Sequence, residues 1–321
     1  MFRWIKLGRV FDPTTIRGVP WLTEFAQAPA TLLFERFVRV YFSCRPVREA
    51  NGQYVSYTSY VDLNRDNLLE VVDLGRQPIL SLGGTGAFDE FGTYPVSVVR
   101  RDDASVAAYY GGWTRCESVP FDVAIGMALS HDDGVTFVRA GTGPVLGRTL
   151  DEPFIISGPK VRRFNDQWQL WYIAGRTWLP SEGRPEPVYR IRMAVSRDGL
   201  SWRRQGIDLI PPRVEENECQ ASPDVFRAGD RYHMFFCYRY SLDYRGRQRG
   251  YRIGYASSHD MIHWVRDDAR AGIDISSEGW DAEMVSYPHV FEVDGQVYML
   301  YLGDQVGRYG FGLARLDGTL G

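Results

Sequence analysis

Short runs of alternating apolar and polar residues recur along the whole chain and are separated by polar turns. In one such pair, Val161–Phe164 and Trp168–Tyr172 flank the polar turn Asn165–Gln167. Alternation with a period of two across a short polar turn is typical of a β-hairpin. The pattern returns at Val225–Phe236 and at Val290–Tyr301. The chain is therefore predicted to be built from repeated antiparallel hairpins.

A proline opens each of these hairpins at a nearly constant spacing. The prolines are separated by 66, 64, 64 and 65 residues, at Pro29, Pro95, Pro159, Pro223 and Pro288. A third strand follows each hairpin and ends in a polar turn before an aromatic residue, as in Ala194–Trp202. A fixed internal period of this length, with four short strands in each unit, predicts a repeat architecture.

The two ends of the chain indicate how the repeat closes. The fifth unit stops after its third strand, at Gly312–Leu316, whereas the N-terminal segment Trp4–Pro13 resembles the fourth-strand segment Trp202–Pro211. We predict an all-β fold, a single five-bladed β-propeller with four-stranded antiparallel blades and almost no helix, in which the N-terminal strand completes the last blade. Such closure leaves no long unpaired strand edge. The blades are expected near residues 20–80, 86–145, 150–212, 215–272, and 280–316 together with 2–12.

Composition agrees with a β-rich fold and excludes some partners. The 321 residues include 17 Phe, 19 Tyr, 9 Trp and 33 Gly, which favour short strands and tight turns. A net charge of −3 without a polybasic run gives no basic field for nucleic acid or a membrane surface. Residues 1–8 lack the apolar core of a signal peptide, so a cytoplasmic protein is expected. The four cysteines lack metal-ligand spacing, so neither a metal nor a cofactor is expected, and the oligomeric state is left open.

Acidic residues precede the hairpin prolines in every unit. The first strand of a propeller blade lines the central channel, so these acids are expected to converge at one mouth of the channel. Building a blade does not require a carboxylate there, and several like charges near one axis raise one another's pKa. The acids predicted to be catalytic are Glu90, Asp151, Glu152, Glu218 and Glu283.

The second strand of each hairpin returns to the same mouth, and three of them end in an arginine. Carboxylates, arginines and aromatic side chains together suit a sugar, because sugar hydroxyls accept and donate hydrogen bonds and glycosidic cleavage needs a pair of carboxyl groups. The residues predicted to bind substrate are Arg45, Arg176, Arg239, Asp89, Gln220, Asp224, Trp113, Tyr287, His289 and Asp304.

Three short motifs carry a resemblance to a known superfamily. Ser222-Pro223-Asp224-Val225 looks like the Ala-Pro-Asp-Val that opens a blade in arabinanases and β-xylosidases, Ser157-Gly158-Pro159 looks like their Glu-Gly-Pro, and Glu218-Cys219 resembles the Glu-Cys pair of invertases. Over essentially its whole length the chain resembles the five-bladed propeller glycosidases, a superfamily that also contains levansucrases and β-mannoside phosphorylases. No subfamily is assigned, because Ser157 replaces the catalytic glutamate before Gly-Pro and Ala28-Pro29 replaces the Asp-Pro of the first blade.

The resemblance implies a glycoside-processing enzyme that acts on a carbohydrate or sugar conjugate at the channel mouth by carboxylate acid/base chemistry, with hydrolysis as the default reaction. The three arginines keep phosphorolysis or glycosyl transfer with an anionic co-substrate open. The replaced catalytic positions also keep a non-catalytic glycan-binding propeller open. The first unit, with Gln27 and few acids, is expected to contribute least to the site.

Overall fold

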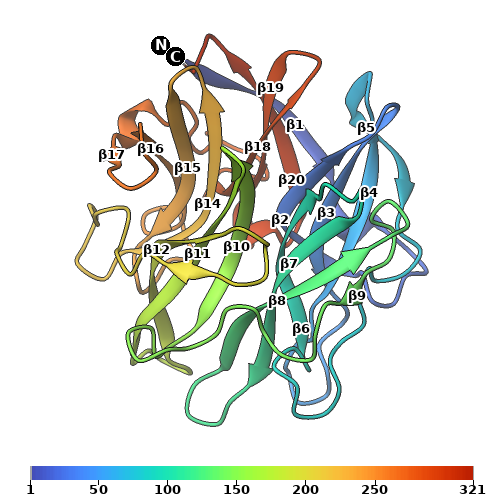
Figure 1. Ribbon diagram of the computed structural model, residues 1–321, viewed down its shortest axis with the longest axis vertical. Coiled ribbons are helices and arrows are strands. Elements are labelled where there is room, and N and C mark those ends of the chain that lie inside the picture. The colour runs from blue at the N-terminus through green and yellow to red at the C-terminus, as the bar shows by residue number, and fades with distance from the viewer. Residues whose placement is uncertain (1, 321) are drawn as a thin grey trace.

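The computed structural model describes residues 2–320 as five four-stranded antiparallel sheets arranged around a central axis (Figure 1). The predicted all-β, five-bladed propeller is confirmed. Blade 1 consists of β2 (Glu24–Leu33), β3 (Phe37–Arg45), β4 (Tyr57–Asn64) and β5 (Asn67–Leu74). Blade 2 consists of β6 (Gly92–Arg100), β7 (Val106–Arg115), β8 (Phe121–Ser130) and β9 (Val138–Arg139).

The remaining three blades repeat the same strand order. Blade 3 consists of β10 (Ile156–Phe164), β11 (Gln167–Leu179), β12 (Glu186–Ser196) and β13 (Arg203–Arg204). Blade 4 consists of β14 (Cys219–Ala228), β15 (Arg231–Arg239), β16 (Arg252–Ser258) and β17 (Val265–Arg266). Blade 5 consists of β18 (Ser286–Val293), β19 (Gln296–Leu302), β20 (Phe311–Asp317) and β1 (Arg3–Phe11).

The N-terminal strand closes the ring, as predicted. β1 pairs antiparallel with β20, from Arg3 opposite Asp317 to Phe11 opposite Phe311, and the two chain ends lie together in Figure 1. Trp4 on β1 packs edge-on against Phe235 of blade 4, with ring centroids 5.4 Å apart. β1 therefore completes the sheet of blade 5 and also fills the core between blades 4 and 5.

Helix is confined to single turns in the part of the chain that the structure describes. These turns are η1 (Pro13–Thr15), η2 (Asp268–Arg270) and α1 (Asp304–Gly307). Within residues 2–320, none of the helices has the length and apolar character needed to cross a membrane.

Every inner strand carries a bulge at its repeating proline. The pairing of each first strand with its second strand shifts register there, for example between Ala221 and Asp224 in β14. In four blades the residue before the proline has a left-handed backbone, with φ of 52° at Ala28, 61° at Gly158, 49° at Ser222 and 51° at Tyr287. Bulges are frequent next to active sites because they redirect side chains. The five bulges thus make every inner strand irregular at the equivalent position of its repeat.

Candidate functional site

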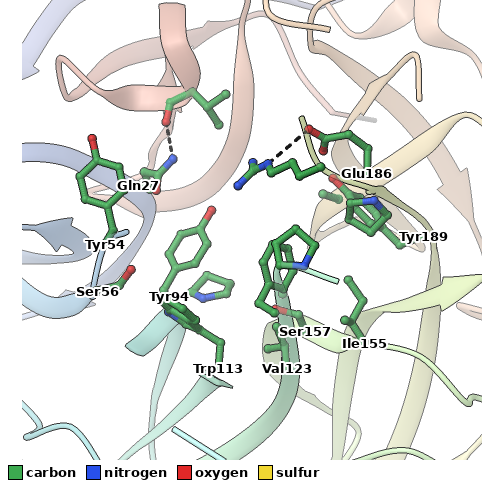
Figure 2. A pocket seen from close by; sticks show the side chains of 18 of the residues that line it. Gln27, Tyr54, Ser56, Tyr94, Trp113, Val123, Ile155, Ser157, Glu186 and Tyr189 are labelled. Carbon is green, nitrogen blue, oxygen red and sulfur yellow. Dashed lines mark hydrogen bonds and ion pairs between the residues drawn. The ribbon is translucent and has the colours of Figure 1, made fainter. Parts of the chain in front are cut away.

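A cavity of about 1290 Å³ opens over these bulges at one end of the channel. All five blades line it, through Ala28, Pro95, Pro159, Ser222 and Tyr287 among others. Figure 2 shows Gln27 and Tyr54 on one side of this space, Glu186 and Tyr189 on another, and Tyr94 and Trp113 between them. The size and the five-fold origin of the lining make this cavity the candidate site for a small ligand or one end of an oligosaccharide.

Aromatic side chains form much of the cavity wall. Trp113 and Tyr287, which the sequence predicted to bind substrate, both line it. The Tyr94 hydroxyl donates to the Tyr287 hydroxyl at 3.0 Å, joining blade 2 to blade 5 across the floor. Tyr189 and Tyr251 extend the wall on the side of blades 3 and 4 and are hydrogen-bonded to each other at 2.9 Å. Such a wall offers faces on which sugar rings stack.

Cationic side chains outnumber acidic ones along the lining. The cations are Arg45, Arg48, Lys160, Arg184, Arg239, Arg245 and Arg308. The acids are Glu117, Glu182, Glu186 and Glu283. Although the chain as a whole has a net charge of −3, the cavity is lined by an excess of positive charge. It is therefore suited to a ligand with an anionic group.

Arg45 projects from the end of β3 and has hydrogen-bonding capacity to spare. One terminal nitrogen donates to Gln27 Oε1 at 3.2 Å, and the guanidinium lies over the rings of Phe25 and Tyr54. Its buried Nε has no hydrogen-bond partner among residues 2–320, and it forms no ion pair with a carboxylate of those residues. Burial lowers the pKa of Arg45. A ligand anion would supply the missing partner.

Arg239, at the end of β15, is held almost entirely by neutral groups. Its nitrogens donate to the hydroxyls of Tyr251 (3.0 Å) and Tyr189 (3.2 Å) and to the carbonyls of Tyr240 and Ser241. Its Cζ atom lies 3.6 Å from the ring centre of Tyr244. Although burial disfavours its charge, the phenol oxygens of Tyr189 and Tyr251 keep the pKa of Arg239 well above its ordinary value.

Other buried arginines of the described chain show what is unusual about Arg239. Arg39, Arg192 and Arg266 each form an ion pair with a buried or half-buried carboxylate, and Arg190 donates to the Glu216 carbonyl. Arg239 alone of this group lines the cavity. A buried charge without a counter-ion is costly. Arg239 therefore places a buried positive charge without a carboxylate partner among residues 2–320 in the wall of the cavity.

The third arginine predicted for the mouth lies elsewhere. Arg176 is exposed and faces Asp208 at 3.7 Å, outside the cavity lining. β11 continues past it to Leu179, and its pairing with β12 shifts register between Gly175 and Thr177. That bulge turns Arg176 out of the site, so the expectation that all three arginines converge is wrong.

Two of the five predicted catalytic acids are buried in ion pairs. Glu218 is completely buried, accepts from Arg266 at 2.6 Å, and also accepts from the backbone N–H groups of Arg213 and Val214. Glu152 is buried against Arg192 and Arg204 and accepts from the Tyr172 hydroxyl at 2.7 Å. Neither side chain lines the cavity.

The same arrangement recurs in other blades. Asp89 is buried against Arg139, at 2.7 Å, and against the Tyr110 hydroxyl. Asp281 is held in the same way by Lys6 of β1 and by Tyr301. In each case an acid before the first strand binds a cation on the fourth strand of its own blade. We name these four contacts the blade clamps, with acids Asp89, Glu152, Glu218 and Asp281. The recurrence of acids before the prolines thus reflects blade construction, and the expectation that they converge at the mouth is corrected.

Four further predicted residues lie outside the cavity. Glu90 accepts from the Gly86 N–H at 2.9 Å, and Asp151 is exposed in the loop before β10. Gln220 is buried and donates to the Ile210 carbonyl and to Glu218. Asp304 accepts from the backbone N–H groups of Glu283 and Met284, so it shapes the segment that carries Glu283 without lining the cavity itself.

Glu283 is the one predicted catalytic acid that the structure places at the cavity. Its side chain is exposed and has no ion-pair or hydrogen-bond partner among the described residues. A second carboxylate, Glu186, was missed from the sequence and lies buried in the wall, where it accepts from the Tyr244 hydroxyl at 3.1 Å and pairs with Arg245 at 3.3 Å. Both carboxylates can receive hydrogen bonds from a sugar, and of these two it is Glu283 that has no cation partner among the described residues.

The channel beneath the cavity holds a polar group of residues that directly follow the repeating prolines. Asp224 accepts from Arg162 at 2.8 Å, from His289 at 2.9 Å and from the Val290 N–H at 2.7 Å. Lys160, which was not predicted from the sequence, is buried beside His289 and also lines the cavity. Asp224 and His289, both predicted to bind substrate, are buried below the floor instead. The signal for Lys160 was its place after Pro159, equivalent to Asp224 and His289.

Blade 1 contributes more than expected. Phe25, Gln27, Arg45, Arg48 and Tyr54 all line the cavity, so the prediction that the first unit contributes least is wrong. No group of three or more His, Cys, Asp or Glu side chains within residues 2–320 is arranged to hold a metal ion.

Comparison with solved structures defines the class of fold. The structure of a BT0996 RGII complex superposes with a TM-score of 0.74, at 17% identity, covering 99% of this chain and 92% of that one. A glycoside hydrolase superposes equally well at 18% identity, with the same coverage of both chains. A member of the GH130 family of mannoside phosphorylases and hydrolases has a TM-score of 0.69 at 13% identity, covering 98% and 94% of the two chains. The chain has the five-bladed propeller fold of glycoside hydrolases and phosphorylases.

Sequence comparison places the chain in a family. It is 36% identical over 315 residues to two proteins of Mycobacterium tuberculosis, MT1551 (strain CDC 1551 / Oshkosh) and Rv1502 (strain ATCC 25618 / H37Rv), covering 98% of this chain and 99% of each relative. The chain belongs to the family of these two proteins, which are described as uncharacterized. No protein-family model matches the chain.

Proposed function

We propose that this protein is a glycoside-processing enzyme whose substrate or co-substrate carries an anionic group. The observation that carries the proposal is the cavity of about 1290 Å³, whose aromatic wall is combined with Arg45 and Arg239, two cations without carboxylate partners among residues 2–320. The aromatic wall suits a saccharide, and the arginines suit a carboxylate or phosphate. The coarse class agrees with the fold of the solved glycoside hydrolases and phosphorylases.

The arrangement of acids favours an anionic reaction partner over simple hydrolysis by a buried carboxylate pair. Glu152 and Glu218 are engaged in blade clamps, and Glu186 is paired with Arg245. Glu283 remains as a carboxylate free to contact a sugar hydroxyl or an attacking oxygen nucleophile. Phosphorolysis, or cleavage or transfer of an acidic saccharide, uses the cations that the cavity presents.

The proposal is tested with a panel of 4-nitrophenyl α- and β-glycosides, including uronides, each assayed with and without inorganic phosphate. We expect release of 4-nitrophenol from a uronide, or release from a neutral glycoside that requires phosphate. Turnover of neutral glycosides alone, unaffected by phosphate, would remove the anionic part of the proposal. Binding of saccharides without any turnover would instead identify a non-catalytic glycan-binding propeller.

A further inference from the structure

Lysine is used at only two positions in this chain. Of the 37 Lys and Arg residues, Lys6 and Lys160 are the two lysines, and all the others are arginines. Lys6 lies on the outer strand β1 and pairs with Asp281 at 2.6 Å in a blade clamp. Lys160 lies on the inner strand β10, is 4% exposed, and lines the floor of the cavity. Because nearly every positive side chain of this protein is an arginine, the lysine in the candidate site is expected to have a chemical property that arginine lacks.

The contacts of Lys160 leave part of its amine free. Nζ donates to the Pro29 carbonyl at 3.3 Å and lies 3.3 Å from His289 Nδ1. His289 Nε2 accepts the Thr31 backbone N–H at 3.0 Å, so the proton of the neutral ring is on Nδ1, where it is donated to Asp224. His289 is therefore no acceptor for Lys160. With one acceptor for three N–H groups and no ion pair to a described carboxylate, the amine has unused donors, and Lys160 itself lines the cavity.

The groups packed around Lys160 come from several strands and act in opposite directions. Burial lowers the pKa of Lys160 to about 8, with the Asp224 carboxylate of β14 opposing the shift, the Arg162 guanidinium of β10 adding to it, and the Cys237 thiol of β15 opposing it. His289 of β18 stays neutral, because burial lowers its pKa to about 4. Lys160 is thus a buried amine at the cavity floor that exchanges a proton near neutral pH, which the neighbouring arginines do not do.

We propose that Lys160 is the catalytic proton donor to the leaving glycosidic oxygen. This inference rests on the proposed function. As the bond between the anomeric carbon and the glycosidic oxygen breaks, its electron pair stays on that oxygen, which takes a proton from Nζ. The anomeric carbon bonds to an oxygen of water, phosphate or an acceptor hydroxyl, whose proton passes to solvent. The neutral amine then regains a proton from water, which balances the cycle.

The first test measures the amine directly and needs no substrate. Protein grown with [ε-13C]lysine gives two lysine signals, and the variant Lys6→Arg assigns them. We expect the Lys160 signal to titrate near pH 8. A midpoint close to the ordinary lysine value of about 10.4 would overturn the proposal, because such an amine is a poor proton donor at neutral pH.

The second test uses the dependence of rate on the leaving group. For the sugar that the wild-type protein cleaves, kcat/KM of Lys160→Met is compared between the phenyl and 4-nitrophenyl glycosides. We expect a loss of about 100-fold or more for the phenyl glycoside, and less than about 10-fold for 4-nitrophenyl, whose anion leaves without a proton. Lys160→Arg keeps the charge but is expected to show the same pattern. Thermal unfolding of both variants checks that they are folded.

The outcomes separate this inference from the function on which it rests. If the wild-type protein cleaves no glycoside, the proposed function fails, and Lys160 has no leaving oxygen to protonate. If the wild-type protein cleaves glycosides but Lys160→Met loses equal activity on both leaving groups, or Lys160→Arg is fully active, only the role of Lys160 as proton donor fails.

Discussion

Side chains at equivalent positions of the repeat can have different surroundings in this protein: some are buried in ion pairs within a blade, and others line the cavity. Glu218 and Glu283 precede successive repeating prolines at the same distance, yet Glu218 is completely buried against Arg266, and Glu283 is exposed at the cavity. The environment of each carboxylate, and not its place in the repeat, decides what it can do. The same reasoning applies to the channel, where burial sets the protonation of His289.

Because their surroundings differ, replacing each of these glutamates by glutamine is expected to have a different effect: on stability for Glu218 and on turnover for Glu283. Glu218→Gln removes a buried charge from Arg266 and should lower the free energy of unfolding by about 3 kcal/mol, while the folded fraction keeps its glycoside turnover. Glu283→Gln should leave stability within about 0.5 kcal/mol and reduce turnover. Urea denaturation and kcat/KM measure the two effects, with Glu292→Gln on the exposed face of β18 as the control. Equal loss of stability in both variants would contradict this division.

His289 predicts a specific pH dependence of stability. Its pKa is about 4 in the folded protein and 6.5 in the unfolded chain, so the unfolded state binds more protons between these values. Stability is therefore lost as the pH falls from 6.5 to 4, by about 3 kcal/mol from this group. His289→Gln, which does not titrate, should show a shallower fall over this range in urea denaturation. An unchanged slope would show that His289 is not held neutral in the folded protein.

At the scale of strands and turns, the repeat explains the fold, and departures from it mark the site. The proline spacing and hairpin pattern predicted the five blades and the closing role of β1, because every unit must bury the same kind of surface against its neighbours. The site was predicted less well. Acids that recur in nearly every unit proved to be clamps, whereas Lys160, Asp224 and His289 differ from blade to blade at one equivalent position. Sequence could not show the bulge that turns Arg176 outward, since register is set by pairing with β12.

The backbone conformation at Ser222 predicts that replacing this residue by glycine increases stability and weakens substrate binding. Ser222 has φ of 49°, and its buried Oγ has no hydrogen-bond partner among the described residues although it lines the cavity. A left-handed backbone costs a residue with a side chain about 1–2 kcal/mol, a cost that glycine avoids. Ser222→Gly should therefore stabilise the protein by about 1 kcal/mol and raise KM for the glycoside. Destabilisation, or an unchanged KM, would argue against a binding role for this hydroxyl.

On the scale of the whole molecule, five blades bring side chains that are distant in sequence to one cavity. Arg45 comes from blade 1, Lys160 from blade 3 and Arg239 from blade 4, and none of them forms an ion pair with a carboxylate of residues 2–320. The protein is slightly acidic overall, so this concentration of positive charge at the channel mouth is local. A local positive field of this kind attracts an anionic ligand to one place on an otherwise acidic molecule.

The most direct test of an anion-binding, glycoside-processing cavity is the kcat/KM of Arg45→Met for the anionic reactant identified by the glycoside panel, whether a uronide or phosphate. Arg36→Met, at an exposed position in the turn between β2 and β3, is the matched control. Loss of one charged hydrogen bond predicts a fall of about 10- to 100-fold for Arg45→Met and wild-type values for Arg36→Met. Wild-type kcat/KM in Arg45→Met would contradict the assignment of this cavity to an anionic saccharide or co-substrate.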